Sequence, residues 1–200
     1  MFPIFQWVIQ LIRYSNRLWD NMEYFTADWH AYHANIIKYC NRPFKDVTEM
    51  NNVIISRLNE RAKRNDRLFV LGDLGFAPVC VLKLFLNQIN CQNIYFIKGN
   101  HDKRTHFVAD RFIWYKDYEV VKIRDKIVVL FHYALRTWDR AHYGSLHLFG
   151  HSHGTLVDNP NALSMDVGVD TNNFYPYSFD DILERMSKKT FKPIDHHEKK

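Results

Sequence analysis

The sequence predicts an α/β protein in which two sheets pack face to face and helices cover them from outside. In the first half of the chain, short apolar runs alternate with amphipathic helical patterns, as in sheets built from strand–helix–strand units. In the second half, extended segments follow one another across short turns, which is typical of hairpins. The chain has 200 residues, of which 46% are hydrophobic. That length allows one domain with a substantial core and is too short to predict two.

The first half is expected to contain three strands and three helices in alternation. The strands are short apolar runs at Glu23–Ala27, Arg67–Leu71 and Ile94–Ile97. Apolar residues at three-to-four spacing predict helices at Ala34–Tyr39, from Val47 to about Leu58, and from Pro78 to about Asn90. Pro43 ends the first helix, and Pro78 suits the first residue of the third. Asp46 and Glu49 form a capping pair at the start of the second.

The second half is expected to be mostly strands, closed by one helix. Tyr118–Ile123 and Ile127–Phe131 read as a hairpin that turns at residues 124–126. Two further strands are expected at Leu146–Phe149 and about Ala162–Val167. Ser178 and Asp181 are spaced as a capping box, which predicts a last helix from there through Met186.

The domain is expected to span residues 22–188, between an N-terminal extension and a basic tail. Residues 1–21 are interpreted as an amphipathic helix or an alternative start, because their apolar stretch is far short of the roughly 20 residues that span a bilayer. They also lack the pattern of a signal peptide. Residues 189–200 form the tail, which holds much of the net charge of +5. Solvation explains that charge, although it mildly favours anionic partners.

Three cysteines lie along the chain without a paired spacing. Cys40, Cys80 and Cys91 form no C-x-x-C motif and leave an odd count. Reduced thiols in the cytoplasm are therefore expected, with each cysteine serving as a small core residue.

Five polar segments, each at the end of an apolar run, contain side chains that bind metals. They are Asp28-Trp29-His30, Gly72-Asp73, Gly99-Asn100-His101-Asp102, His132 and Gly150-His151-Ser152-His153. Residues two apart on a strand point to the same side, so Asp28 and His30 are expected to reach one ion together, as are His151 and His153. The three glycines permit sharp turns that lift the next side chain out of the sheet. Such a mixture of imidazole, carboxylate and amide groups favours manganese, with zinc or iron(II) as alternatives.

In this order, the five segments resemble those of the calcineurin-like metallophosphoesterase superfamily, from about Met22 to Leu183. Within it, the chain resembles small phosphoesterases typical of phages and bacteria. The segments that carry this likeness are Ala34-Asn35-Ile36-Ile37, Asn41-Arg42-Pro43-Phe44 and Asp166-Val167-Gly168-Val169-Asp170. The resemblance implies a four-layer α/β/β/α sandwich and a site for two divalent metal ions.

The resemblance also implies a role for each residue of the five segments. Asp28, His30 and His153 would hold one metal, Asn100, His132 and His151 the other, and Asp73 would bridge them. A metal-bound hydroxide would attack phosphorus in line, while His101 assists the phosphate and the leaving group. Asp102 is expected to accept the other ring N–H of His101 and to fix its tautomer.

Several neighbouring residues have expected roles of their own. Three residues are candidates to bind substrate: His33, Arg104 and Arg136. The alternative for His33 is a helix-capping role, and the alternative for the two arginines is a solvated position on the surface. Asp166 is a candidate to orient a ligand histidine, and Trp29 is expected to point away from the metals into the core. Phe76 occupies the position of the tyrosine that coordinates iron in purple acid phosphatases, so a tyrosinate-coloured ferric site is not expected.

The expected activity is hydrolysis of phosphodiesters or small nucleotide-like phosphates, including nucleic acid ends. A phosphomonoesterase of the same fold is one alternative. The other is a scaffold protein that retains the metals without catalysis, against which the intact His101 and ligand residues argue.

Overall fold

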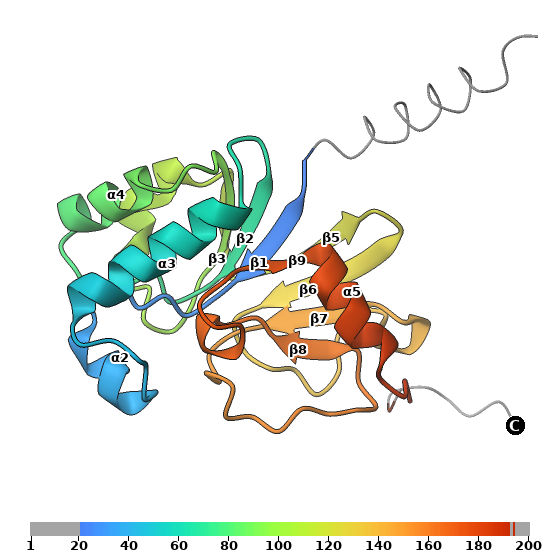
Figure 1. Ribbon diagram of the computed structural model, residues 1–200. Helices are drawn as coiled ribbons and strands as arrows, with labels where there is room; N and C mark the ends of the chain where they lie inside the picture. Colours follow the sequence, from blue (N-terminus) through green and yellow to red (C-terminus); the bar gives the residue numbers. More distant parts are fainter. Residues whose placement is uncertain (1–20, 193, 195–200) are drawn as a thin grey trace, which may run out of the picture.

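A computed structural model describes residues 21–192 and 194 (Figure 1). The predicted N-terminal extension, apart from Asn21, lies outside the described residues, as does the end of the predicted tail. Lys189 and Lys192, at the start of that tail, lie against the domain: the Lys189 ammonium donates to the Ser164 carbonyl, and the Lys192 amide donates to the Asn161 carbonyl. Among the described residues, no helix is both long and apolar enough to cross a membrane.

The first sheet contains the strands that alternate with helices, in the order β4-β3-β2-β1-β9. Strands β1 (Glu23–Thr26), β2 (Arg67–Leu71), β3 (Asn93–Ile97) and β4 (Trp114–Lys116) run parallel, and β9 (Tyr177–Ser178) runs antiparallel to β1. Their connections contain α2 (Ala34–Tyr39), α3 (Val47–Arg61), α4 (Val79–Asn87) and the 3-10 helix η1 (Thr105–Arg111). Because β1, β2 and β3 are parallel, their carboxyl ends meet at one edge of the sheet.

The second sheet has the order β5-β6-β7-β8. Only β5 (Tyr118–Ile123) and β6 (Lys126–Phe131) form the predicted hairpin. The expectation that the later strands also run as hairpins is wrong, because β7 (Leu146–Phe149) and β8 (Ser164–Asp166) run parallel to β6. Their crossovers are mainly loops, so no amphipathic pattern marks them in the sequence. The same parallel direction brings the carboxyl ends of β6 and β7 toward the edge used by β1–β3.

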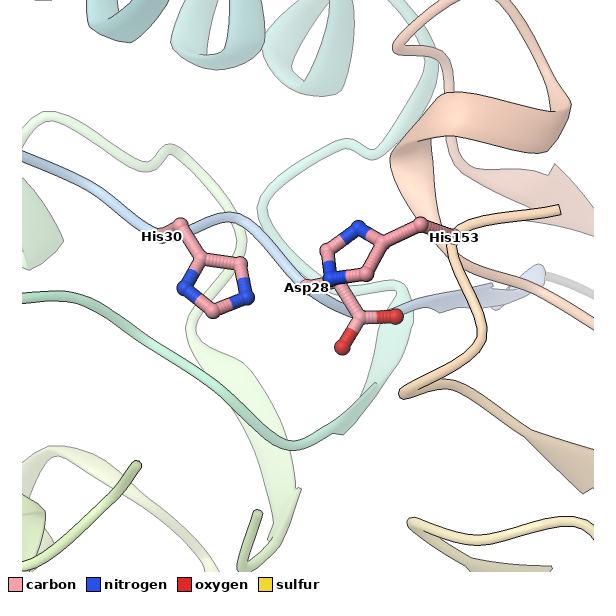
Figure 2. A group of neighbouring side chains, drawn as sticks. All are labelled: Asp28, His30 and His153. Atoms are coloured by element: carbon pink, nitrogen blue, oxygen red, sulfur yellow. The ribbon is translucent and has the colours of Figure 1, made fainter. Parts of the chain in front are cut away.

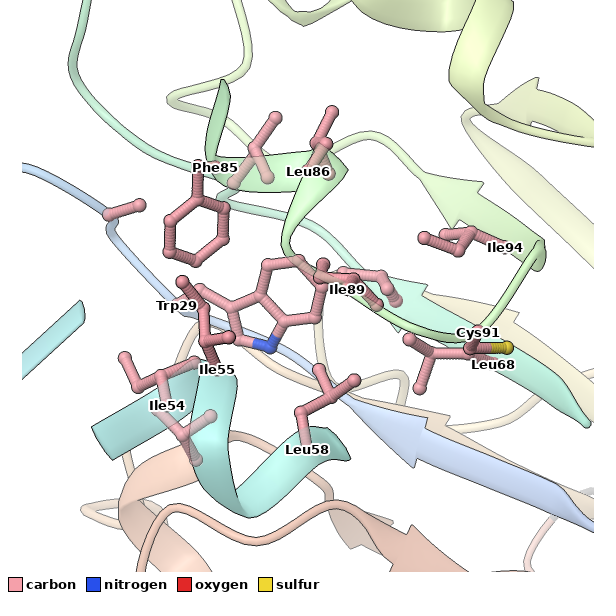
Figure 3. Packing of buried hydrophobic residues seen from close by; sticks show 14 of the residues in the cluster. Trp29, Ile54, Ile55, Leu58, Leu68, Phe85, Leu86, Ile89, Cys91 and Ile94 are labelled. Carbon is pink, nitrogen blue, oxygen red and sulfur yellow. The ribbon is translucent and has the colours of Figure 1, made fainter. Parts of the chain in front are cut away.

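Two apolar clusters hold the layers together. Between the sheets, Phe25 stacks on Phe69 with ring centroids 5.0 Å apart, and both belong to a cluster that includes Val128, Leu130 and Leu148. On the outer face of the first sheet, residues of α3 and α4 pack on β2 and β3 around Trp29 (Figure 3). Trp29 is fully buried there, its ring 5.8 Å from that of Phe85, as predicted.

Two mixed sheets flanked by helices confirm the predicted fold class. The outer face of the second sheet is covered by Trp138 and by the 3-10 helix η2 (Ala141–Tyr143), packed on Val129. Helix α5 (Phe179–Ser187) directs Phe179 and Ile182 into the cluster between the sheets.

The predicted helix starts agree with the structure, with one shift. The Asp46 carboxylate accepts from the Glu49 amide at 2.9 Å, and Ser178 with Asp181 forms a complete capping box. Pro78 is the N-cap of α4 rather than its first residue, and the helix ends three residues before the predicted Asn90.

The three cysteines are free, but they do not share one environment. Cys91 is buried and Cys40 half-buried, so both contribute to the core. The prediction of a core role for Cys80 is wrong, because this residue lies on the exposed side of α4.

One buried histidine makes stability depend on pH. His147 lies on β7, where its ring accepts the Leu135 amide at 3.1 Å and burial lowers its pKa to about 4. Because an unfolded histidine titrates near 6.5, this neutral ring stabilises the fold fully above that pH, and the contribution is lost between pH 6.5 and 4.

We therefore expect His147→Gln to reduce the loss of stability on acidification. The free energy of unfolding is measured with urea at pH 7.5 and at pH 4.5. Between these two pH values, wild type should lose roughly 2–3 kcal/mol more of this free energy than the variant. His106→Gln, at an exposed position, serves as the control. Equal pH dependence in wild type and His147→Gln would contradict this assignment.

Candidate metal centre and active site

The predicted site residues converge where the carboxyl ends of both sheets meet. The turn after β1 is held to that after β2 by amides of Asp28 and His30, which donate to the carbonyls of Gly72 and Asp73 at 3.0 and 2.9 Å. The His101 amide donates to the Asp73 carboxylate at 2.9 Å. The His151 amide donates to both oxygens of Asp28, at 3.0 and 2.9 Å, which joins the second sheet to the first.

The backbone at these residues is not a strand. Strand β1 ends at Thr26, and Asp28 and His30 have φ values of 58° and 49°. His151 and His153 are also left-handed, with φ values of 65° and 47°. The strand-alternation argument for these pairs is therefore wrong, although Asp28 and His30 do meet. Left-handed non-glycine residues are uncommon and concentrate at functional sites.

The three glycines are needed for two different reasons. Gly72 has a φ of 98°, which a side chain disfavours, so it provides the predicted turn. Gly99 and Gly150 do not have this conformation; they make room for carboxylates. A Cβ on Gly150 would lie 2.7 Å from Asp28 Oδ2, and one on Gly99 would overlap Asp73 Oδ1.

The predicted ligands form two groups of donor atoms that share the Asp28 carboxylate. The first metal group is Asp28, His30 and His153, and the second is Asp28, Asp73 and His132. Asp28, His30 and His153 have donor atoms within 4.8 Å of one another (Figure 2), and so do Asp28, Asp73 and His132. Asp73 Oδ2 lies between two imidazoles, 3.4 Å from His30 Nε2 and 3.6 Å from His132 Nε2. Asp28 thus contacts both groups, whereas the sequence predicts sharing only for Asp73.

Asn100 and His151 complete the second half of the site. Asn100 Oδ1 lies 2.9 Å from His132 Nε2 and 3.0 Å from His151 Nδ1. His132 Nδ1 lies 2.7 Å from the Leu71 carbonyl, so the ring donates there, and the lone pair of Nε2, beside Asn100 Oδ1, is left free for a cation. All seven predicted metal ligands are therefore brought together. Asn100 and His151 are exposed, whereas Asp28, His30, Asp73 and His132 are buried.

The buried groups fit a bound cation. Both ring nitrogens of His30 are buried without a hydrogen-bond partner. Burial lowers the pKa of His30 to about 2, which keeps the ring neutral and its lone pair available. Burial, together with the negative charges of Asp166 and Asp73, raises the pKa of Asp28. Divalent cations would bind the free lone pairs and offset the negative charge.

Asp102 is not the partner of His101, and that prediction is wrong. Its carboxylate is buried below the turns and accepts the amides of Asp73 and Gly99 at 2.7 Å and that of Leu74 at 3.0 Å. It also accepts the Thr105 hydroxyl at 2.7 Å. Asp102 therefore ties the turn after β2 to the turn after β3. His101 itself is exposed, its ring 5.5 Å from that of His30.

A buried arginine and a second aspartate hold the first metal group, and the sequence did not indicate them as a pair. Arg42 forms a two-point ion pair with Asp170 at 2.7 and 2.8 Å. The same guanidinium donates to the carbonyls of Asp28 and Trp29. Asp170 in turn lies 2.7 Å from His153 Nδ1.

The carboxylate that orients a predicted ligand histidine is therefore that of Asp170 and not, as predicted, that of Asp166. Asp166 instead accepts the amides of Gly154 and Gly168, at 2.9 and 2.7 Å. Burial alone would raise the pKa of Asp170, but hydrogen bonds from His153 and Arg42 and the charge of Arg42 lower it. A carboxylate that accepts from Nδ1 leaves Nε2 of His153 free for a metal.

The three predicted substrate residues lie in different surroundings. His33 is the N-cap residue of α2, but its side chain forms no capping hydrogen bond, and its ring lies 5.5 Å from that of His30. Arg104 is exposed at the start of η1. Arg136 is exposed and, with Gly154, lines a cavity of about 910 Å³. Only His33 therefore touches the metal groups.

Comparison with known proteins agrees with this geometry. The profile of the calcineurin-like phosphoesterases matches residues 24–193, which is most of the chain. The chain belongs to the calcineurin-like phosphoesterase family. This phosphoesterase is 33% identical over 172 residues to an uncharacterised protein of Methanocaldococcus jannaschii, a match that covers 82% of this chain and 91% of that protein.

A solved structure shares the fold of this phosphoesterase. It is a protein of unknown function from Aquifex aeolicus, with a TM-score of 0.66 and 23% sequence identity. The match covers 83% of this chain and 100% of the other. The family assignment makes the protein a hydrolase of phosphoric esters, in a family that typically depends on divalent metals. The clustered donor atoms agree with that dependence.

We expect Asp170→Asn and Arg42→Met to weaken Mn²⁺ binding by about 10- to 100-fold. The first variant removes the carboxylate that orients His153, and the second removes the guanidinium that holds this carboxylate. Isothermal titration of EDTA-stripped protein measures this. Arg61→Met is a matched control, since Arg61 also pairs with an aspartate, Asp181 at 2.7 Å, but on the half-exposed surface of α3. Affinities within twofold of wild type in both site variants would contradict the role of this pair.

Proposed function

We propose that this protein is a phosphodiesterase that uses two divalent cations to hydrolyse phosphodiesters or small nucleotide-like phosphates. The observation that carries the proposal is the position of the Asp73 carboxylate between His30 and His132. In this proposal, Asp28, His30 and His153 hold one cation, Asn100, His132 and His151 hold the other, and Asp73 contacts both. When bound, two such cations lower the pKa of a water nucleophile and offset the charge of the phosphate.

The side chains around the cations define the rest of the proposal. Asp28 and Asp73 supply two negative charges against the four positive charges of two divalent cations, which leaves the centre attractive to an anionic phosphate. His101 is exposed beside His30 and is proposed to bind the phosphate and to donate a proton to the leaving oxygen. His33 lies beside His30 and is proposed to contact the substrate.

The open rim supports a diester over a monoester. Asn100, His101 and His151 are all exposed, so a phosphate bound among them has room for two ester groups. Arg104 and Arg136 remain proposed phosphate contacts that substrate binding would have to bring closer. A phosphomonoesterase is the second candidate, because the same groups also fit a terminal phosphate. A scaffold without catalysis is disfavoured by the intact set of seven ligands and His101.

Manganese is the proposed metal, and the cytoplasm the proposed location. Four imidazoles, two carboxylates and one amide make a donor set of borderline softness, for which zinc and iron are the alternatives. The three free cysteines support a reducing compartment. The proposed partners are small phosphorylated molecules, nucleotides or nucleic acid ends, in accord with a net charge of +5.

The test is turnover of bis(p-nitrophenyl) phosphate and p-nitrophenyl phosphate by Mn²⁺-loaded protein. We expect faster turnover of the diester, and a decrease in kcat of at least about 100-fold in His101→Ala, because this variant loses the side chain proposed both to bind the phosphate and to donate a proton. His106→Ala, which removes an exposed histidine outside the site, is the control.

Two results would contradict the proposal. One is a wild-type protein that turns over neither ester, and the other is a His101→Ala variant as active as wild type on both. Faster turnover of the monoester would instead favour the phosphomonoesterase.

A further inference from the structure

Exposed aromatic rings lie beside the first metal group. Phe76, in the loop after β2, is 42% exposed although its ring packs 4.2 Å from that of His33. Its ring also lies 5.9 Å from that of His30, nearly parallel at 14°, and 5.0 Å from that of His101. Phe76 thus presents a ring to solvent next to the residue proposed to protonate the leaving group.

A second exposed ring lies beside the other metal group. Tyr133 directly follows His132 and is 39% exposed. Its ring lies 5.0 Å from that of His132 and 4.7 Å from that of His151. Asp73 contacts both His30 and His132, so Phe76 and Tyr133 each lie beside an imidazole that contacts this carboxylate.

Exposed rings at these positions have a chemical use that packing alone does not explain. The ligand side chains interact with a phosphate and do not distinguish what is attached to it. An aromatic ring open to solvent stacks on planar groups such as nucleobases, whatever their hydrogen-bonding edges. Two rings on either side of one phosphate match a diester with a planar group on each side, whereas a monoester can use only one of them.

We propose that Phe76 and Tyr133 are stacking platforms for the two ester groups of the substrate. This inference rests on the proposed phosphodiesterase function and names its substrate class: diesters with a nucleobase or another planar aromatic group on both sides of the phosphate. Phe76 lies beside His101 and takes the leaving group. Tyr133 takes the group that stays on the phosphate.

Two esters with the same leaving group distinguish the role of Phe76 from that of Tyr133. Thymidine 5′-(p-nitrophenyl phosphate) has a planar group on both sides, and methyl p-nitrophenyl phosphate has one only on the leaving side. We expect Phe76→Leu to raise KM for both esters by about tenfold, and Tyr133→Leu to do so only for the thymidine ester. Phe76→Tyr and Tyr133→Phe retain the platforms and should keep KM near that of wild type.

Tyr143→Leu is the matched control, because Tyr143 is 80% exposed on η2 outside the site. Unchanged KM values in Phe76→Leu and Tyr133→Leu, or equal increases in Tyr143→Leu, would overturn the inference. Binding of thymidine 5′-monophosphate to Mn²⁺-loaded protein tests the stacking role of Tyr133 independently of the proposed catalytic function. If wild type turns over neither ester, the proposed function fails. In that case, about tenfold weaker binding of this nucleotide in Tyr133→Leu than in wild type still supports Tyr133 as a stacking platform. Unchanged binding in Tyr133→Leu overturns that role.

Discussion

Two carboxylates buried at one edge of two sheets are the constraint on which the rest of this structure depends. Asp28 is fully buried and Asp73 nearly so, and burial raises the pKa of Asp28. Burying a charge costs several kcal/mol unless other groups compensate for it. Amides of His151 and His101 each donate to one of these carboxylates, and the neighbouring imidazoles have lone pairs to offer. In the proposed function, bound cations would complete this arrangement, so stability and chemistry would depend on the same atoms.

Much of the surrounding chain serves to bring these carboxylates together. Gly99 and Gly150 lack the Cβ atoms that would collide with them. Asp102 holds the turns after β2 and β3 in place through three backbone amides. Arg42 holds the carbonyl of Asp28 and, through Asp170, the ring of His153. These supporting groups are as important for the geometry as the ligands, because a metal site is only as rigid as the residues that orient it.

The sequence predicted local features well because local chemistry determines them. Apolar runs that end at Gly72 and Gly99 marked β2 and β3, and Ser178 with Asp181 marked the start of α5. The order and type of the polar segments predicted which seven side chains would meet. The strand-alternation argument offered for Asp28 and His30 was nevertheless wrong, since their left-handed backbone is imposed by hydrogen bonds to the neighbouring turn.

Features that depend on distant parts of the chain could not be predicted in this way. Arg42 and Asp170 are 128 positions apart, and no spacing rule pairs them. The Asp102 carboxylate was assigned to its neighbour His101, although it lies under the turns and accepts amides of Asp73 and Leu74 from the turn after β2. The parallel direction of β7 and β8 depends on loop crossovers that have no periodic pattern.

The most direct test of this account is the number of metal ions that each chain binds. EDTA-stripped protein is loaded with Mn²⁺, freed of excess metal and measured by elemental analysis, for wild type and for Asp73→Asn. We expect two ions per chain in wild type and at most one in the variant, because an amide cannot supply the charge that two cations share. Fewer than two ions in wild type, or two ions in Asp73→Asn, would contradict it.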